Sequence, residues 1–453
     1  MKTLYFLLII NSISLIISSP IELRGIVEGF YGTPWTFEDR ADLIKFSGKY
    51  KLNAYIYAPK DDSYHRDKWR EPYPEDKIKE LKDLITISKE NKVKFIFAVS
   101  PGLDLNYYGQ KGEEDFNTLM EKLNSIYEIG GRDFAIFFDD INADSNSGKN
   151  QANFLNKLYE ELNSKYSDIN SLITVPTEYW YDSMIDGDGN IKQYTKDFTK
   201  ILDKNIIVLY TGDGVVCDGI SDESFQKAIE IYNRDLGIWW NYPVNDFLPA
   251  KLALGPIEKL PTKNVKSIFF NPMQQVQLSK VALATGAEYS LSPESYDSDK
   301  SWNNVIEAQF GENAEAMKVF TKHSRHMENS WAYAGPADAP EFYEEAHQAV
   351  LNTKAQKSFD FSKLIELIDE MEESADTLLN NLDSNILSEC KLQLEQFKRI
   401  INADRVAVKS LQNRKLDPDL KDLRKSINKY ESKAIISEKS AVKFIDDVLD
   451  LLH

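Results

Sequence analysis

Two adjacent carboxylates, Asp139 and Asp140, are the residues of this sequence best suited to chemistry. They follow the apolar run 134–138, which reads Phe-Ala-Ile-Phe-Phe and has the composition of a buried strand. Two like charges at the end of such a run repel each other and are costly to bury. The pair is therefore easier to explain at the mouth of a core, where carboxylates can transfer protons. A structural pair that caps the next helix or meets lysines is the alternative.

The elements that must position this pair are short apolar runs that alternate with helical patterns. Besides the run that ends at Asp139, strands are predicted at 25–31, 53–58, 93–99, 171–175, 206–210, 236–240 and 267–270. Amphipathic spacing predicts helices such as 76–91 and 151–165. Alternation of this kind is typical of a parallel sheet covered by helices, and eight strands predict an α/β chain with a (β/α)₈ TIM barrel. An open doubly wound sheet is the alternative, although its Gly-x-Gly-x-x-Gly fingerprint is missing.

The pattern changes after about residue 310. Strand signals disappear, and a Gly- and Pro-containing stretch at 334–340 precedes long apolar stripes at 361–381, 386–411 and 420–452. These stripes predict an antiparallel, all-α helical bundle at the C-terminal end. The predicted domains are a signal peptide at 1–19, a catalytic barrel at 20–310 and the bundle at 311–453.

The first residues have the form of a secretory signal peptide. Lys2 precedes an apolar stretch from Leu4 to Ile17, and the small residues Ser18 and Ser19 follow. A membrane-spanning helix is the alternative, but the stretch is short for a bilayer and polar residues interrupt it. We therefore expect a secreted, extracellular protein with no membrane segment after cleavage.

Composition excludes several kinds of partner. The chain has 453 residues with 54 basic and 72 acidic side chains, which give a net charge of −18. This balance argues against nucleic acid and anionic membranes, because both need clustered positive charge. The two cysteines, Cys217 and Cys390, form no disulfide framework and are expected to be independent thiols. His323 and His326 lie three residues apart without a third metal ligand, so a surface pair is expected.

The residues that follow the predicted strands are polar or aromatic. They lie at 28–35, 59–62, 139–140, 176–180, 211–213, 239–246 and 271–273. In a barrel these positions meet at the C-terminal rim, where the active site lies. Carboxylates, amides, a lysine and aromatic rings that converge there have the composition of a sugar site, since hydroxyls need polar partners and a pyranose face packs on a ring.

Four of these segments together resemble glycoside hydrolase family 84. They are Gly-Ile-Val-Glu-Gly-Phe-Tyr-Gly at 25–32, Tyr-Ala-Pro-Lys-Asp-Asp at 57–62, Phe-Asp-Asp-Ile at 138–141 and Trp-Trp-Asn-Tyr-Pro-Val-Asn-Asp at 239–246. The resemblance covers residues 24 to 290 and is looser in the helical region. Members are β-N-acetylglucosaminidases, including protein O-GlcNAcases and bacterial enzymes labelled hyaluronidases. The Trp-Trp-Asn-Tyr-Pro form is similar to the secreted bacterial branch.

The resemblance implies a retaining reaction in which the substrate's own 2-acetamido oxygen attacks the anomeric carbon and forms an oxazoline. It assigns Asp139 to the acetamido N–H and Asp140 to protonation of the leaving oxygen and later deprotonation of water. A bend at the strand end would let the two neighbours address two atoms of one sugar. Their proximity is expected to raise one of the two pKa values, which suits an acid near neutrality.

The resemblance also implies substrate-binding residues. Tyr179 would bind the acetamido group, Lys60 and the Gly29 backbone would meet the 3-hydroxyl, and Asp246 and Asn271 would hold the hydroxyl groups of the non-reducing end. Trp239 and Asn241 would line the acetamido side, and Tyr31 would help to wall the pocket. Taken singly, each of these side chains has an alternative structural reading in loop hydrogen bonding, ion pairing or core packing. Trp240 and Tyr210 depart from some relatives. Glu28 and Glu178 lie near the rim but are expected only to brace it.

The expected function is hydrolysis of terminal β-linked N-acetylglucosamine from glycoproteins or glycans, with no cofactor and no metal. Two alternatives stay open. One is endo-cleavage of hyaluronan, and the other is a catalytically silent module that binds N-acetylglucosamine. The expected partner is a glycan or glycoprotein that carries this sugar, and the sequence does not determine an oligomeric state.

Overall fold

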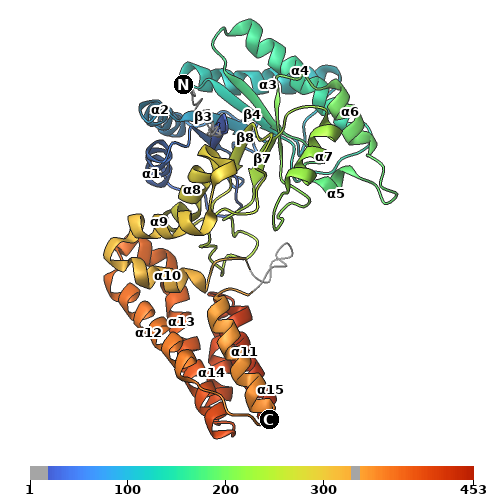
Figure 1. The fold of residues 1–453 in the computed structure, drawn as a ribbon. Coiled ribbons are helices and arrows are strands. Elements are labelled where there is room, and N and C mark those ends of the chain that lie inside the picture. The colour runs from blue at the N-terminus through green and yellow to red at the C-terminus, as the bar shows by residue number, and fades with distance from the viewer. Residues whose placement is uncertain (1–18, 328–336) are drawn as a thin grey trace, which may run out of the picture.

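The computed structural model describes residues 19–327 and 337–453, and the predicted signal peptide lies outside this part of the chain except for Ser19. Eight parallel strands form a closed barrel in sequence order (Figure 1). Their bounds are β1 Leu23–Glu28, β2 Ala54–Tyr57, β3 Lys94–Val99, β4 Asp133–Phe137, β5 Ser171–Val175, β6 Ile207–Tyr210, β7 Gly237–Trp240 and β8 Ser267–Phe270. The barrel closes where β1 pairs with β8, with Gly25 opposite Phe269. The predicted barrel is therefore confirmed, and an open sheet is excluded.

Side-chain alternation along each strand divides the apolar residues between two cores. One set points into the barrel and includes Val27, Ile56, Ala98, Phe137 and Phe269. The neighbouring residues point outward and pack under the helices. Because both faces of every strand are buried, the strands read as continuous apolar runs, which explains why the sequence identified them.

Helices follow seven of the eight strands, and the segment 241–266 between β7 and β8 forms neither a helix nor a regular strand. Some helix starts have local capping, as at α1, where the Thr36 hydroxyl accepts from the Asp39 N–H at 3.1 Å. The helices of the barrel are α1 Phe37–Lys49, α2 Glu75–Glu90, α3 Gly109–Glu128, α4 Ser147–Lys165, α5 Tyr181–Met184, α6 Gln193–Ile201, α7 Asp222–Tyr232 and α8 Val276–Leu291.

The rest of the described chain is helical (Figure 1). The helices are α9 Ser298–Phe310, α10 Ala314–Lys322, α11 Pro340–Lys354, α12 Ser362–Asn381, α13 Ser384–Asn413, α14 Asp419–Tyr430 and α15 Lys443–Leu451, with short turns η1 Pro293–Ser295, η2 Gly311–Asn313 and η3 Glu438–Val442. The stripe predicted at 420–452 is not one helix, because the chain leaves the helix after Tyr430 and re-enters it at Glu438. A buried Ser437 with φ of 56° marks this break. In the described residues, we found no helix that is long and apolar enough to cross a membrane.

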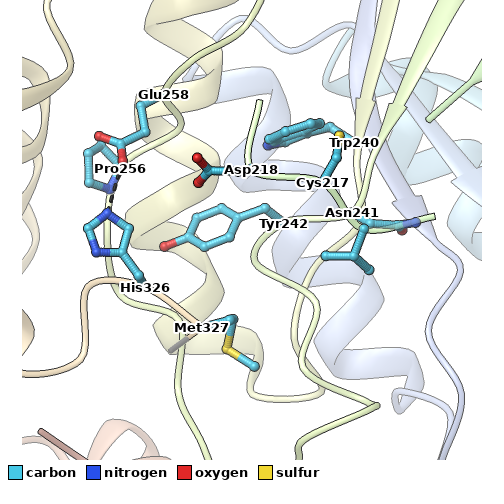
Figure 2. A pocket seen from close by; sticks show the side chains of 10 residues that line it. Cys217, Asp218, Trp240, Asn241, Tyr242, Pro256, Glu258, His326 and Met327 are labelled. Carbon is cyan, nitrogen blue, oxygen red and sulfur yellow. Dashed lines mark hydrogen bonds and ion pairs between the residues drawn. The ribbon is translucent and has the colours of Figure 1, made fainter. Parts of the chain in front are cut away.

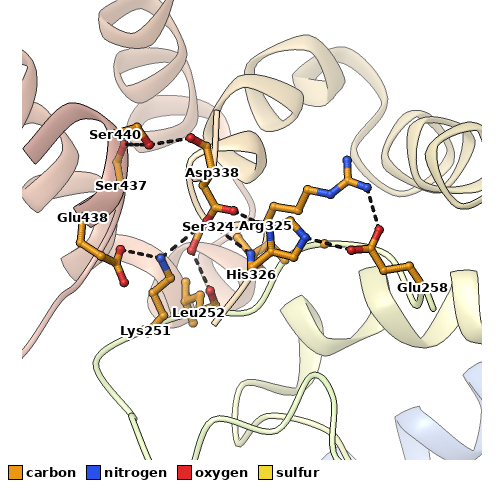
Figure 3. Close-up of polar contacts among 12 residues, drawn as sticks. Lys251, Leu252, Glu258, Ser324, Arg325, His326, Asp338, Ser437, Glu438 and Ser440 are labelled. Carbon is orange, nitrogen blue, oxygen red and sulfur yellow. Dashed lines mark hydrogen bonds and ion pairs between the residues drawn. The ribbon is translucent and has the colours of Figure 1, made fainter. Parts of the chain in front are cut away.

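The bundle is joined to the catalytic side of the barrel by polar contacts (Figure 3). Lys251, from the segment between β7 and β8, is fully buried and lies 2.7 Å from the Glu438 carboxylate of η3. His326 bridges two carboxylates, with Nε2 2.9 Å from Glu258 and Nδ1 2.7 Å from Asp338. Burial tends to lower the pKa of His326, but the two carboxylates outweigh it and raise the pKa above its usual value.

A second contact joins the bundle to the start of α8. The Glu389 carboxylate of α13 accepts the backbone N–H groups of Gln277 and Leu278 at 3.0 and 2.9 Å. A carboxylate at this position satisfies donors that a helix start leaves free. The bundle thus supplies a cap for the helix that follows β8.

Candidate active site

A cavity of about 230 Å³ opens at the C-terminal ends of the strands. All of the residues that the sequence analysis assigned to the site line it: Gly29, Tyr31, Lys60, Asp139, Asp140, Tyr179, Trp239, Asn241, Asp246 and Asn271. They come from the ends of β1, β2, β4, β5, β7 and β8, so closure of the barrel brings them together. The structure establishes their position, whereas the individual roles remain predictions.

Asp139 is the buried member of the carboxylate pair. Its Oδ2 atom forms a close ion pair with the Lys60 ammonium group, which comes from the end of β2. Its Oδ1 atom is buried and has no hydrogen-bond partner among the described residues. A buried acceptor without a donor is costly, so this oxygen is suited to a donor on a bound molecule.

Asp140 is the exposed member and has an unusual backbone conformation. Its φ of 56° lies in the left-handed region, which aspartate adopts more readily than most residues. On a regular strand, neighbouring side chains point to opposite faces, but this turn lets both carboxylates line one cavity. Its two oxygens accept hydrogen bonds from Tyr31 Oη at 2.6 Å and Tyr179 Oη at 2.9 Å. Arg66 also donates to Tyr31 Oη at 2.7 Å.

The pKa of Asp140 is lowered from its ordinary value in this arrangement. Burial acts to raise it, but the charge of Lys60 and the hydroxyl groups of Tyr31 and Tyr179 together outweigh burial. The expectation of a raised pKa is therefore wrong for Asp140. Sequence adjacency indicated repulsion between the carboxylates, whereas the folded chain surrounds Asp140 with a cation and two donors.

Amides and an indole ring form the opposite wall. Asn241 Oδ1 accepts from Trp239 Nε1 at 2.7 Å and from Asn271 Nδ2 at 2.9 Å. Asn271 Oδ1 in turn accepts from the Gly29 N–H at 3.3 Å. A Cβ atom at Gly29 would lie 2.3 Å from Trp239 Cζ2, so the close approach of backbone and ring requires glycine. Asn241 is also fixed by donation to the Val215 carbonyl at 2.7 Å.

Asp246 closes the cavity near Tyr31. Its Oδ2 atom accepts the Tyr31 backbone N–H at 2.8 Å. Burial raises the pKa of Asp246, with a further contribution from the negative charge of Asp140. A carboxylate in this environment gains from hydrogen-bond donors, which sugar hydroxyls can provide.

The sequence analysis missed two parts of the site. A mostly apolar wall comes from Val175, Thr211, Val215, Val216, Val244 and Phe247, of which only Thr211 and Val244 lie in the strand-end segments named from the sequence. These residue types carry no chemical signal, although the position of those two after predicted strands could have indicated them. Arg66 was also missed, because it lies outside the strand ends and reaches the pair only through Tyr31 and the Asp140 carbonyl.

The two rim carboxylates that were expected only to brace the barrel do not line the cavity. Glu28 is buried and forms two hydrogen bonds of 2.8 Å with the Arg40 guanidinium group. Glu178 accepts from Thr195 Oγ1 at 2.5 Å. The expectation that they are structural is supported by these contacts.

Trp240 and Tyr210, which the resemblance marked as departures from some relatives, lie outside the cavity. Trp240 lines a small neighbouring pocket with Tyr242, Cys217 and His326 (Figure 2). The Tyr210 side chain is fully buried and packs against Phe225. Neither side chain lines the cavity around the carboxylate pair.

The structure places His323 and His326 in surroundings that differ from the surface pair predicted from the sequence. His323 is buried and its Nδ1 atom lies 2.8 Å from Ser437 Oγ, while His326 bridges Glu258 and Asp338. The expected surface pair is therefore wrong, because helix packing covers His323. No cluster of potential metal ligands occurs in the described ranges 19–327 and 337–453. Cys217 and Cys390 are both free thiols, as expected.

Comparison with known proteins agrees with this geometry. Residues 24–322 match the family described as beta-N-acetylglucosaminidase, and residues 345–445 match one described as hyaluronidase post-catalytic domain-like. The chain is 35% identical to the protein O-GlcNAcase of Mus musculus over 281 residues, and 35% identical to that of Rattus norvegicus over 283. These alignments cover 59% of this chain but only 30% of each relative's length.

Two solved structures are similar over 95% of this chain. CpGH84B has a TM-score of 0.89 and 38% identity, with 77% of its chain covered. A mutant O-GlcNAc hydrolase from Thermobaculum terrenum has a TM-score of 0.82 and 29% identity, with 94% covered. A closed barrel with paired carboxylates at its rim, together with these matches, defines a glycoside hydrolase. The chain belongs to the β-N-acetylglucosaminidase family.

Proposed function

We propose that this enzyme removes terminal β-linked N-acetylglucosamine from glycoproteins or glycans with retention of configuration, through an oxazoline intermediate. The observation that carries the proposal is the division of the carboxylate pair. Asp139 is buried, bound to Lys60 and left with one free acceptor, whereas Asp140 is exposed and held by two hydroxyl groups. Two carboxylates in such different environments are suited to two different roles.

Asp139 orients the nucleophile in this mechanism. Its free Oδ1 accepts the acetamido N–H, which directs the acetamido oxygen to the anomeric carbon. As the C–O bond forms, positive charge develops on the acetamido nitrogen, and the carboxylate stabilises it. The ion pair with Lys60 fixes the orientation of the Asp139 carboxylate.

Asp140 is the acid and then the base. It protonates the glycosidic oxygen as the bond to the leaving group breaks, and it later takes a proton from the water that opens the oxazoline. Substrate binding acts against the lowered pKa of Asp140. When the Tyr179 hydroxyl turns to donate to the acetamido oxygen, Asp140 loses one of its two hydroxyl donors and its pKa rises. Substrate binding therefore promotes protonation of the acid.

The remaining side chains hold the sugar. Asp246 and Asn271 bind the hydroxyl groups of the non-reducing end, Lys60 and the Gly29 backbone meet the 3-hydroxyl, and Trp239 and Asn241 line the acetamido side. Tyr31 forms part of the outer wall beside Asp140. The small volume of the cavity, about 230 Å³, supports removal of a single terminal sugar over binding along a polymer.

Release of N-acetylglucosamine from O-GlcNAc peptides, glycan ends and an aryl β-N-acetylglucosaminide tests this proposal. Asp140→Asn should reduce kcat/KM roughly 10²–10⁴-fold because it removes the general acid. Asp67→Asn changes an exposed aspartate outside the cavity and should leave activity unchanged. A thiazoline mimic of the oxazoline should inhibit competitively. An active enzyme that is indifferent to this mimic would refute the substrate-assisted route.

A second candidate is endo-cleavage of hyaluronan, which the match of residues 345–445 to a hyaluronidase-like family favours. Loss of polymer viscosity without release of monosaccharide would support it over the first proposal. A silent binding module would bind N-acetylglucosamine without turnover of any substrate. Secretion is also part of the proposal, on the strength of the apolar leader pattern at 4–17, and N-terminal sequencing of the mature protein tests it.

A further inference from the structure

A second cavity, of about 580 Å³, lies at the opposite end of the barrel from the catalytic rim. The first residues of several strands and the segments just before them line it, including Leu23, Lys94, Ser171, Ile207 and Ser267. In a barrel enzyme this N-terminal end is ordinarily concerned with stability and not with catalysis. Nothing in the proposed reaction uses the residues found there.

Positive charge is concentrated in this cavity, although the whole chain has a net charge of −18. No carboxylate of the described residues lies within 4.0 Å of any of the cationic groups concerned. The like charges of such a cluster repel one another, which favours the binding of an anion between them. Four cationic side chains line it: Lys94, Lys204, Arg234 and Lys266.

Two buried donor atoms in the same lining, Arg234 Nε and Ser267 Oγ, have no hydrogen-bond partner within the described part of the chain. Arg234 is only 8% exposed and donates through its Nη atoms to the carbonyl groups of Leu202, Asp203 and Ile206, at 2.6 to 3.0 Å. Its Nε atom has no hydrogen-bond partner among the described residues, and the same holds for Oγ of Ser267, which is 2% exposed. Unpartnered donors with this degree of burial are rare and costly.

The nearby acidic groups offset the positive charge of the cluster only in part. The charge of Asp203 acts on Arg234, while its Oδ1 atom accepts the Asn205 N–H at 2.8 Å. Glu22 and Asp235 are exposed at its edge and form no ion pair with its cations. Asp133 lies beside the lining, but its oxygens accept from Asn170 Nδ2 at 3.0 Å and Ser171 Oγ at 2.9 Å. The lining itself therefore holds four cationic side chains against two carboxylates, together with the unpartnered Arg234 Nε and Ser267 Oγ atoms.

We propose that this cavity binds a tetrahedral oxyanion, either sulfate or phosphate. Such an ion offers several acceptor oxygens in different directions, which matches donors that reach the cavity from separate strands and loops. A neutral sugar is a poor match, because the lining contains no aromatic ring on which a pyranose face could pack. The oxyanion can be a free inorganic ion or an ester group on a glycan, since both present the same chemistry.

Calorimetric titration of the enzyme with sodium sulfate tests the proposal, in buffers whose ionic strength is held constant with chloride. Wild-type protein should bind one sulfate saturably. The double variant Lys94→Gln, Lys266→Gln should bind about tenfold more weakly, because an exposed lysine contributes threefold to fivefold. Ser267→Ala should weaken binding by about tenfold through loss of a buried donor to a charged ligand. Hydrolysis of an aryl substrate should be unchanged in the double variant.

Lys263→Gln is the matched control, because Lys263 is an exposed lysine near Lys266 that does not line the cavity. Equal sulfate affinity in wild type and in the double variant would overturn the proposal, as would the absence of saturable binding or an equal loss in the control. N-acetylglucosamine 6-sulfate distinguishes the sources. Tighter binding of this ester than of inorganic sulfate, lost in the double variant, indicates a glycan ester, while equal affinity indicates a free ion.

Discussion

Replacement of Tyr31 by phenylalanine should raise the pKa of Asp140. The Tyr31 hydroxyl lies 2.6 Å from Asp140 Oδ2 and donates to it, and this hydrogen bond is one of the causes of the lowered pKa. Phenylalanine removes the donor but keeps the backbone N–H that binds Asp246. The ring and its place in the wall are also retained. The variant therefore isolates one donor to the proposed acid.

The magnitude follows from the strength of a hydrogen bond to a charged group, about 1.5–3 kcal/mol. One pKa unit corresponds to about 1.4 kcal/mol. Both side chains are exposed at the rim, where solvent screens the interaction, so the low end of the range applies. We expect a rise of about one pKa unit. Since Asp140 must be protonated to act as the acid, activity should persist to higher pH in the variant.

The measurement is kcat/KM for an aryl β-N-acetylglucosaminide as a function of pH, because this ratio reports groups of the free enzyme. The descending limb of the Tyr31→Phe profile should move to higher pH by about one unit. This shift is expected even if the plateau value of kcat/KM also changes. The limb belongs to the coupled carboxylate pair and not to one residue alone. Tyr108→Phe, at an exposed tyrosine outside the cavity, is the control. Coincident limbs for wild type and Tyr31→Phe would refute the reasoning.

Three further changes test other parts of the structure. Gly29→Ala should lower kcat/KM and cost about 1–3 kcal/mol in unfolding free energy, because the new Cβ would lie 2.3 Å from the Trp239 ring. Glu28→Gln should lower the free energy of unfolding, measured by urea denaturation, by about 3–5 kcal/mol. The substitution leaves the buried Arg40 cation without its charged partner. Burial raises the pKa of Glu389 from 4.5 in the unfolded chain to about 7 in the folded chain. Protonated Glu389 therefore contributes its full stabilisation below pH 4.5, and this stabilisation is lost as the pH rises to about 7. Glu389→Gln should remove this pH dependence, which amounts to about 3–4 kcal/mol and is measured by urea unfolding at several pH values.

Controls for these changes come from the same chain. Gly187→Ala introduces a Cβ into open space and should change neither activity nor stability measurably. Glu71→Gln removes an exposed carboxylate that lies 4.0 Å from Lys68, and its effect should stay below about 0.5 kcal/mol. Wild-type stability in Glu28→Gln, or an unchanged pH dependence in Glu389→Gln, would contradict the assigned contacts.

Much of the fold was predictable because its signals are local. Strands buried on both faces have continuous apolar runs, and β5 and β8 begin and end at the predicted residues. Amphipathic helices were equally visible, since α2 differs from its predicted range by one residue at each end. The break between α14 and α15 was missed, because the apolar spacing continues through 431–437 while the backbone does not.

The residues of the site were also predictable, but their contacts were not. Parallel strands in a barrel present their C-terminal ends at one rim, so the segments that follow the strands had to meet. The sequence could not show that Lys60 pairs with Asp139, 79 residues away, and leaves Asp61 and Asp62 to other partners. The direction of the Lys60 side chain decides which carboxylate it meets, and this direction depends on the local backbone.

The sequence by itself determined the adjacency of Asp139 and Asp140, their position at a strand end and the set of residues around them. Only the tertiary structure decided how the pair is divided. The left-handed backbone of Asp140 and the approach of Tyr31 and Tyr179 lower its pKa, whereas adjacency alone suggested that one pKa would rise. The physical reason is that a pKa depends on every charge, donor and apolar group within a few ångströms, and the fold brings those groups from distant parts of the chain.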